Sequence, residues 1–204
     1  MSTPQSPADE RELQELLAAE GPPESERRYA WVLTGSGHYL RESLELATTL
    51  DRVDCFLTSA AEEVLPMYGW SLPLLREALA GRGRVLRDTT ASAAPVGLLY
   101  RGHYHTVVVA PATSNTVAKC VQGISDTLGT NMLAQAGKCR VVCIVFACDT
   151  EPVVVTDAPH RRVVLYPRPI DLENTDRLRR FERMTVVTTP AELAAALERR
   201  SACL

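Results

Sequence analysis

The stretch that decides the fold reads Thr106-Val107-Val108-Val109-Ala110-Pro111-Ala112-Thr113-Ser114-Asn115-Thr116-Val117-Ala118-Lys119. Its β-branched beginning is typical of a buried parallel strand. The hydroxyl-bearing residues that follow predict a loop and an N-cap for a helix entered at Val117. A strand that passes into a helix in this way can hold an anion, because free N–H groups and the positive end of the helix dipole face the loop. An ordinary capped turn is the alternative interpretation.

Strands and helices alternate on both sides of this stretch. Apolar runs predict strands at residues 29–33, 53–57, 84–86, 140–147 and 184–187, with shorter β candidates at 153–155 and 162–166. Helical spacing predicts helices at 40–47, 72–79, 126–137 and 191–199, and a helix or turn at 171–178. Residues 88–97 read as an irregular loop that could lie over a site. This order indicates an α/β protein with a mainly parallel sheet.

Composition narrows the class of protein. The chain has 204 residues, 46% of them hydrophobic, which suits one domain with a substantial core. Its formal net charge of -3 gives no broad cationic surface, so neither nucleic acid nor an anionic membrane is an expected partner. No apolar run reaches the roughly 18 residues of a membrane helix, and the polar start of the chain does not read as a signal peptide. We therefore expect a soluble, cytoplasmic protein.

The six cysteines do not form a metal-binding motif. There is no C-x-x-C pair, and the spacing of Cys139, Cys143 and Cys148 fits neither zinc nor iron–sulfur sites. Cys55 and Cys143 fall within predicted strands, where cysteine acts as a small buried hydrophobe. We expect reduced thiols and no metal. Cys148, just beyond the end of a strand, is the cysteine that could face a ligand.

Residues 1–28 differ from the rest of the chain. They are polar and contain several prolines, with Leu13, Leu16 and Leu17 on one face of a short predicted helix and a linker at 21–26. We predict a helical leader and linker over 1–28 and a ligand-binding domain over 29–204. The leader could cover the core or a neighbouring subunit, or be mobile.

Three predicted strand ends carry glycines and hydroxyls, at residues 34–37, 58–59 and 113–116. Because parallel strands end at one edge of a sheet, we expect these loops to cradle a phosphate. Leu40 stands where a dinucleotide motif needs its third glycine, residues 55–59 offer no acid for the ribose, and no P-loop lysine follows. A monophosphate held by amides and hydroxyls remains, consistent with flavin mononucleotide (FMN). The alternative is that Gly35 and Gly37 only make a tight turn.

The central motif resembles a known superfamily. Residues 110–119, with Gly123-Ile124-Ser125-Asp126-Thr127-Leu128 and Asn131, are similar to flavoproteins that include the homo-oligomeric flavin-containing cysteine decarboxylases. Residues 34–37 and 58–60 resemble the first and second binding loops of that superfamily. Residues 113–119, 131–138 and Asp171-x-Glu173-Asn174-x-x-Arg177-Leu178 most resemble the branch of dihydromethanopterin reductase (acceptor) and archaeal flavoproteins. The resemblance covers about residues 29 to 187.

This resemblance implies a Rossmann-like (flavodoxin-like) three-layer sandwich, with FMN bound non-covalently at a subunit interface of a homo-oligomer. The loops after the first and second strands would serve the phosphate and ribityl chain, through Gly35, Ser36, Gly37, Thr58 and Ser59. The loop after the central strand would lie against the ribityl chain and isoalloxazine, through Thr113, Ser114, Asn115 and Thr116. Asn115 has the most specific expected role, because an amide can donate to one flavin atom and accept from another.

The chain departs from the decarboxylases at two places. Their Pro-x-Met-Asn-x-x-Met-Trp substrate clamp should follow the strand that ends near Ala147, where this chain has Cys148-Asp149-Thr150-Glu151-Pro152. Their catalytic histidine should follow the helix after the second strand, but residues 60–80 contain no histidine. Decarboxylation is therefore disfavoured, and redox chemistry by the flavin is the better interpretation.

Several other polar residues have candidate roles. His38 lies in the glycine-rich turn and could approach the flavin phosphate or a substrate. Asp126 and Asp149 could orient a substrate, although a helix cap and a loop turn explain them equally simply. His103 and His105 begin the central strand, so we expect them far from the site; His160 lies in a loop and reads as solvated.

The resulting hypothesis is an FMN-dependent oxidoreductase that transfers a hydride from reduced flavin to a pterin-type substrate and is recharged by a separate electron donor. The pterin comes from the resemblance, since no residue identifies it. Three alternatives remain open: an FMN electron carrier without its own substrate, a non-redox decarboxylase-like or prenyl-transferring FMN protein, and an assembly protein with an empty site.

Overall fold

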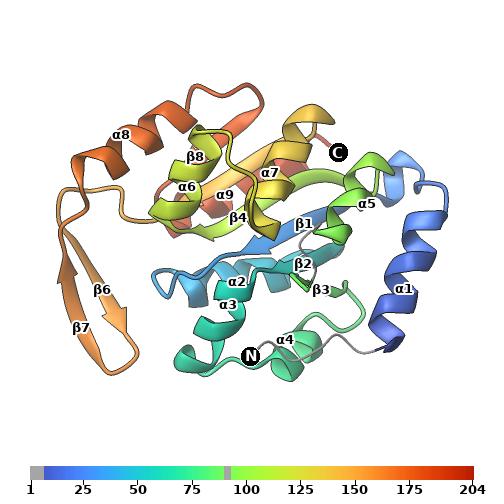
Figure 1. Ribbon diagram of the computed structural model, residues 1–204, viewed down its shortest axis with the longest axis horizontal. Helices are drawn as coiled ribbons and strands as arrows, with labels where there is room; N and C mark the ends of the chain where they lie inside the picture. Colours follow the sequence, from blue (N-terminus) through green and yellow to red (C-terminus); the bar gives the residue numbers. More distant parts are fainter. Residues whose placement is uncertain (1–6, 90–92) are drawn as a thin grey trace.

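Six parallel strands form the main sheet of the computed structural model, which describes residues 7–89 and 93–204 (Figure 1). They are β1 (Arg28–Leu33), β2 (Val53–Leu57), β3 (Val85–Arg87), β4 (Tyr104–Ala112), β5 (Val142–Ala147) and β8 (Met184–Val187). The spatial order is β3-β2-β1-β4-β5-β8, and every neighbouring pair is parallel. The strand order reverses between β1 and β4, which is where an open parallel sheet binds its ligand.

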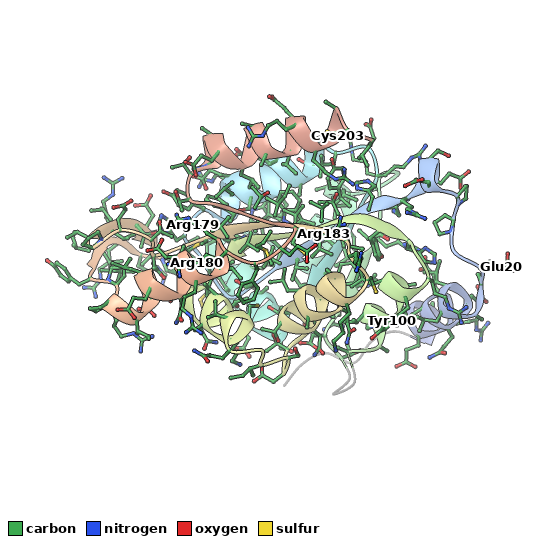
Figure 2. The ribbon with its side chains drawn as sticks, turned by 90° about the horizontal axis from the view of Figure 1, so that it is seen from above. Glu20, Tyr100, Arg179, Arg180, Arg183 and Cys203 are labelled. Carbon is green, nitrogen blue, oxygen red and sulfur yellow. The ribbon has the colours of Figure 1, made fainter. Side chains whose placement is uncertain are left out.

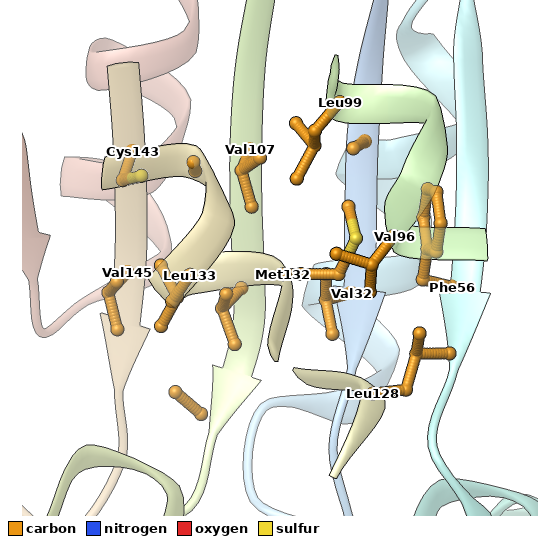
Figure 3. Packing of buried hydrophobic residues seen from close by; sticks show 14 of the residues in the cluster. Val32, Phe56, Val96, Leu99, Val107, Leu128, Met132, Leu133, Cys143 and Val145 are labelled. Atoms are coloured by element: carbon orange, nitrogen blue, oxygen red, sulfur yellow. The ribbon is translucent and has the colours of Figure 1, made fainter. Parts of the chain in front are cut away.

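Helices cover both faces of this sheet. One face packs against α2 (Leu40–Thr49), α4 (Leu72–Ala78) and α9 (Pro190–Ser201). The other packs against α1 (Pro7–Ala18), α5 (Gly97–Tyr100), α6 (Ser114–Val121), α7 (Leu128–Lys138) and α8 (Pro169–Leu178). Figure 3 shows this second face, with Val32, Val107 and Val145 of the sheet near Met132 and Leu133 of α7. The predicted three-layer α/β sandwich is confirmed.

A β-hairpin stands apart from the main sheet. Its strands are β6 (Val154–Ala158) and β7 (Arg161–Leu165), which pair antiparallel with each other. The hairpin lies beyond the carboxyl ends of the main strands, at the opposite end of the molecule from α1 (Figure 1). The Tyr68 hydroxyl donates to the carbonyl of Asp157 at 3.1 Å, which ties the hairpin to the short helices α3 (Ser59–Val64) and η2 (Leu65–Tyr68).

Several element boundaries differ from the sequence prediction. Strand β4 continues past Val109 to Ala112, through a cis Ala110-Pro111 bond. Helix α6 begins at Ser114, three residues earlier than predicted, because Thr113 already caps it. Helix α7 is capped by Thr127 instead of Asp126. The predicted loop 88–97 contains η3 (Ala94–Val96) and leads directly into α5, because its apolar residues pack against α7; residues 90–92 lie outside the described part.

Helix α1 covers the core at the amino ends of the strands. Leu13 is buried, and Leu16 and Leu17 pack against the same apolar cluster. The chain then passes through the short helix η1 (Glu24–Glu26) into β1. The division of the chain at residue 29 stays a prediction. Within residues 7–89 and 93–204, every helix is too short or too polar to cross a membrane.

Candidate functional site

The loops after β1 and β4 are joined by the side chain of Thr34. Its hydroxyl donates to the carbonyl of Pro111 at 2.7 Å and accepts from the backbone N–H of Thr113 at 3.1 Å. Only 3% of Thr34 is exposed, so water has little access to this link. Because β1 and β4 flank the point where the strand order reverses, the link fixes the two sides of the crevice against each other.

The loops after β1 and β2 are joined in a similar way. The Thr58 hydroxyl donates to the carbonyl of Leu33 at 3.0 Å and accepts from the N–H of Ala61 at 3.2 Å, which caps α3. Gly35 approaches the same helix so closely that a Cβ would lie 2.8 Å from the Cβ of Ala60. Glycine is therefore required at position 35 by close approach of the backbone.

The loop after β4 presents the first turn of α6. Thr113 caps this helix by accepting from the N–H of Thr116 at 3.1 Å. The Ser114 hydroxyl lies 3.4 Å from the carboxylate of Asp149, which follows β5. Asn115 is exposed, and its amide makes no hydrogen bond to the described residues. That amide is therefore free to donate to and accept from a ligand.

Cys148 connects the end of β5 to the loop after β1. The Ser36 hydroxyl is 3.4 Å from the Cys148 sulfur and 3.3 Å from the carbonyl of His38, while the thiol can donate to that carbonyl at 3.6 Å. Burial raises the pKa of the Cys148 thiol to about 12, so the thiol is uncharged at neutral pH. The Ser36 hydroxyl is thus engaged within the protein and would have to rotate to reach a phosphate.

Three aromatic rings stack beside this loop. The ring centroids of His38 and Tyr39 are 3.8 Å apart, and those of Tyr39 and Phe146 are 4.9 Å apart. The Nδ1 atom of His38 is buried without a hydrogen-bond partner in the described part of the chain. Burial lowers the pKa of His38, although the carboxylates of Asp149 and Glu42 oppose that shift. A buried polar atom without a partner is a group that a ligand can satisfy.

A pocket of about 240 Å³ adjoins this aromatic stack. The glycine-rich turn, Arg41, Trp70 and residues 155–157 of the hairpin all contribute to its lining. Tyr68 packs directly over Gly37, where any Cβ would overlap the tyrosine ring. Packing of Tyr68 is therefore sufficient to explain the glycine at position 37. This explanation holds whether or not the backbone of Gly37 also contacts a ligand.

Asp88 begins the predicted loop at residues 88–97, but its contact with α7 was not predicted from the sequence. It follows β3, and its carboxylate accepts from the N–H of Leu128, the first residue of α7, at 3.1 Å. Burial raises the pKa of Asp88, while the hydrogen bond from Leu128 opposes the shift. Its backbone carbonyl lies 3.4 Å from the Ser59 hydroxyl, so Asp88 borders the loop after β2. Its place directly after a strand was the available signal.

Comparison with known proteins identifies the family. The family model described as Flavoprotein matches residues 18–202. The chain belongs to the flavoprotein family. Burkholderia xenovorans DmrB, whose structure in complex with FMN is described as a cubic protein cage for redox transfer, is 60% identical with a TM-score of 0.80. That match covers 87% of this chain and 97% of DmrB. The predicted family and cofactor are confirmed.

Two curated relatives extend the comparison. An uncharacterized protein of Methanocaldococcus jannaschii is 37% identical over 175 residues, which cover 81% of this flavoprotein and 91% of the relative. A dihydromethanopterin reductase (acceptor) of Methanosarcina mazei is 35% identical over 145 residues, which cover 66% of this chain. The matched region spans 60% of that reductase.

The fold of this flavoprotein brings the predicted binding residues to one edge. All nine lie in the loops or first helical turns after β1, β2 and β4: Gly35, Ser36, Gly37, Thr58, Ser59, Thr113, Ser114, Asn115 and Thr116. Their contacts with FMN stay a prediction. Two polar groups at this edge, the Asn115 amide and His38 Nδ1, lack a partner among the described residues, which fits a polar cofactor.

Other candidates fall outside this group. Asp126 is exposed and pairs with Lys119 at 2.7 Å. His103 and His105 lie at the start of β4, opposite the candidate site, and His160 lies in the turn of the hairpin. All six cysteines are unpaired. Among residues 7–89 and 93–204, no three His, Cys, Asp or Glu side chains gather in a way that could hold a metal ion.

Proposed function

We propose that this flavoprotein is an FMN-dependent oxidoreductase that reduces a pterin-type substrate, dihydromethanopterin or a close relative. The observation that carries the proposal is the crevice between the loops after β1 and β4, which Thr34 links and Asn115 borders. The 60% identity to the FMN-binding DmrB supports the cofactor, and the 35% identity to a dihydromethanopterin reductase supports the substrate class.

Each loop has a distinct proposed task. The turn after β1 and the first turn of α3 would hold the phosphate through backbone N–H groups and the exposed Ser59 hydroxyl. The first turn of α6 would lie along the ribityl chain and the ring, with the Asn115 amide matching donor and acceptor atoms of the flavin. When bound and reduced, FMN would supply the hydride that a pterin C=N bond accepts.

The substrate nitrogen also needs a proton. His38 is the candidate for its delivery, because its ring lies in the turn after β1 and lines the pocket of about 240 Å³. With a lowered pKa, His38 would be neutral at pH 7, so it would pass a proton that it receives from water or from a neighbouring acid. The nearby Asp149 carboxylate would favour the transient positive charge on His38.

Assembly would complete the site. Ser59 and Asn115 are exposed in the single chain, so the flavin edge is open on one side. A second copy of the chain would cover this edge and exclude water from the reduced flavin. We propose a homo-oligomer with FMN at a subunit interface, in line with the cage described for DmrB. A separate protein or small molecule would supply the electrons.

A visible spectrum followed by a single-turnover experiment tests this function. The purified protein should be yellow and should release FMN on heating. The holoprotein, photoreduced without oxygen, should then be reoxidised by dihydromethanopterin, and tetrahydromethanopterin should form in an amount equal to the flavin. An electron carrier without a substrate site would stay reduced. A colourless protein without affinity for FMN would contradict the proposal as a whole.

A further inference from the structure

A second cavity lies away from the flavin edge, between α6, α7 and the segment that joins α8 to β8. Its volume is about 570 Å³, within the range of about 300–1,000 Å³ that is typical of small-molecule sites. Apolar groups and thiols line its interior, including Cys120, Leu133, Val141, Cys143, Leu178 and Met184. The lining reaches the amino ends of β5 and β8, whereas the flavin edge lies at the carboxyl ends.

The rim of this cavity is cationic. Lys138, Arg140 and Arg183 line it, and Glu182 is the one carboxylate among its lining residues. Lys138 and Arg140 form no ion pair with the described residues. Among the residues that the structure describes, Arg183 pairs only with the neighbouring Glu182, at 3.9 Å, and the side chain of Glu182 is 89% exposed. Figure 2 shows Arg183 at the level of the sheet, between the layers of α7 and α9.

The backbone holds two of these arginines in an unusual geometry. Arg140 has φ +56° and Arg183 has φ +57°, the left-handed region that favours glycine and asparagine. They precede neighbouring parallel strands, and the N–H of Cys143 donates to the carbonyl of Arg183 at 2.9 Å. Two arginines that precede neighbouring strands thus line the same cavity, at backbone positions where glycine or asparagine would be less strained.

We propose that this cavity binds an amphipathic anion, namely a carboxylate on an aliphatic chain of medium length. The chain would lie among Leu133, Val141 and Met184, where burial of apolar surface stabilises it. The carboxylate would lie at the mouth, where Arg140 and Arg183 can form charge-assisted hydrogen bonds with it. A neutral ligand would gain the apolar contacts without this pairing. The site does not depend on the flavin chemistry proposed above.

Calorimetric titration of the FMN-loaded protein with decanoate tests the proposal, with decanol as the uncharged control. We expect saturable binding of one decanoate per chain and binding of decanol that is at least about fivefold weaker. Arg140→Asn combined with Arg183→Asn removes both charges but suits a positive φ, so the fold should persist and decanoate affinity should fall about fivefold or more. Ala134→Phe, which fills the cavity, should abolish binding.

The control variant is Arg199→Gln, an exposed arginine of α9 on the other face of the sheet, which should leave decanoate binding unchanged. FMN content and unfolding temperature report folding in every variant. The proposal fails if the wild-type protein shows no saturable binding, if decanol binds as tightly as decanoate, or if the double variant keeps full affinity. A fall in assembly mass in the double variant, without decanoate binding to the wild type, would instead identify this face as a contact between copies.

Discussion

The link between the loops after β1 and β4 gives the sharpest prediction. Thr34→Val keeps the shape of the side chain and removes its hydroxyl, so the carbonyl of Pro111 and the N–H of Thr113 lose their shared partner. Leaving the buried carbonyl unsatisfied should cost about 1–3 kcal/mol of unfolding free energy. Water can partly replace the bond to the half-buried Thr113, so that loss should be about 0.5–1 kcal/mol.

The expected total is a loss of about 1.5–4 kcal/mol, which corresponds to a fall of roughly 3–16 °C in Tm for a chain of this size. FMN affinity should also fall, by about tenfold, because the loop after β4 must then be ordered by the cofactor instead of by Thr34. Urea unfolding of the apoprotein and quenching of FMN fluorescence measure the two effects. Both are compared at one protein concentration, since the proposed subunit assembly would also stabilise the fold.

Thr34→Ser is the matched control. It keeps the hydroxyl and removes one methyl group, so it should cost about 1 kcal/mol and leave FMN affinity nearly unchanged. If Thr34→Val lies within about 0.5 kcal/mol of the wild type, or if Thr34→Ser is as damaging as Thr34→Val, the hydrogen bonds do not hold the crevice together and the reasoning is refuted.

Three further predictions follow from single groups. Asn115→Ala should weaken FMN binding at least about tenfold without changing apoprotein stability, because the exposed amide has no partner among the described residues; equal losses in both assays would contradict this. Gly37→Ala should cost about 1–3 kcal/mol by overlap with Tyr68 and become nearly neutral in a Tyr68→Ala background. Burial and nearby Arg200 lower the pKa of His105 to about 4, against about 6.5 in the unfolded chain. The neutral ring therefore stabilises the fold fully above pH 6.5, and this contribution is lost as the pH falls toward 4, by about 1–2 kcal/mol after screening of the half-exposed ring. His105→Gln should flatten that part of the stability profile in urea titrations.

The sequence alone predicts the layers and the edge that carries the site. The strands of a parallel sheet are buried on both faces, so each appears in the sequence as a continuous apolar run. Such a run can be identified without knowing which strands it pairs with. The N-cap hydroxyls after the central strand are equally local, because Thr113 bonds to a residue three positions later, whereas the helix that Thr58 caps was not predicted. These local signals indicate the edge of the sheet that carries the site, whereas the roles of the individual binding residues come from the resemblance to the flavoprotein superfamily.

The features that sequence reasoning missed depend on contacts between distant residues. The Asp88 carboxylate accepts from the N–H of Leu128, forty positions later, and nothing near Asp88 in the sequence indicates that contact. Tyr68 covers Gly37 and bonds to Asp157 in the hairpin, so three separate segments determine one small pocket. The positive φ angles of Arg140 and Arg183 at the second cavity likewise appear only in the three-dimensional structure.

A hydroxyl in these loops can either hold neighbouring parts of the fold together or bind a ligand, and its burial distinguishes the two roles. Thr34 belongs to the first predicted binding loop and Thr58 is a predicted cofactor contact, yet they are 3% and 5% exposed. Their hydroxyls donate to backbone carbonyls of the neighbouring strands β4 and β1. Ser59 and Asn115 follow in the same kind of loop but are exposed. Because a group that is saturated within the protein gains little from a ligand, substitutions of the first pair should act mainly on stability and those of the second mainly on FMN affinity. The motif therefore encodes a preorganised crevice as much as the contacts made inside it.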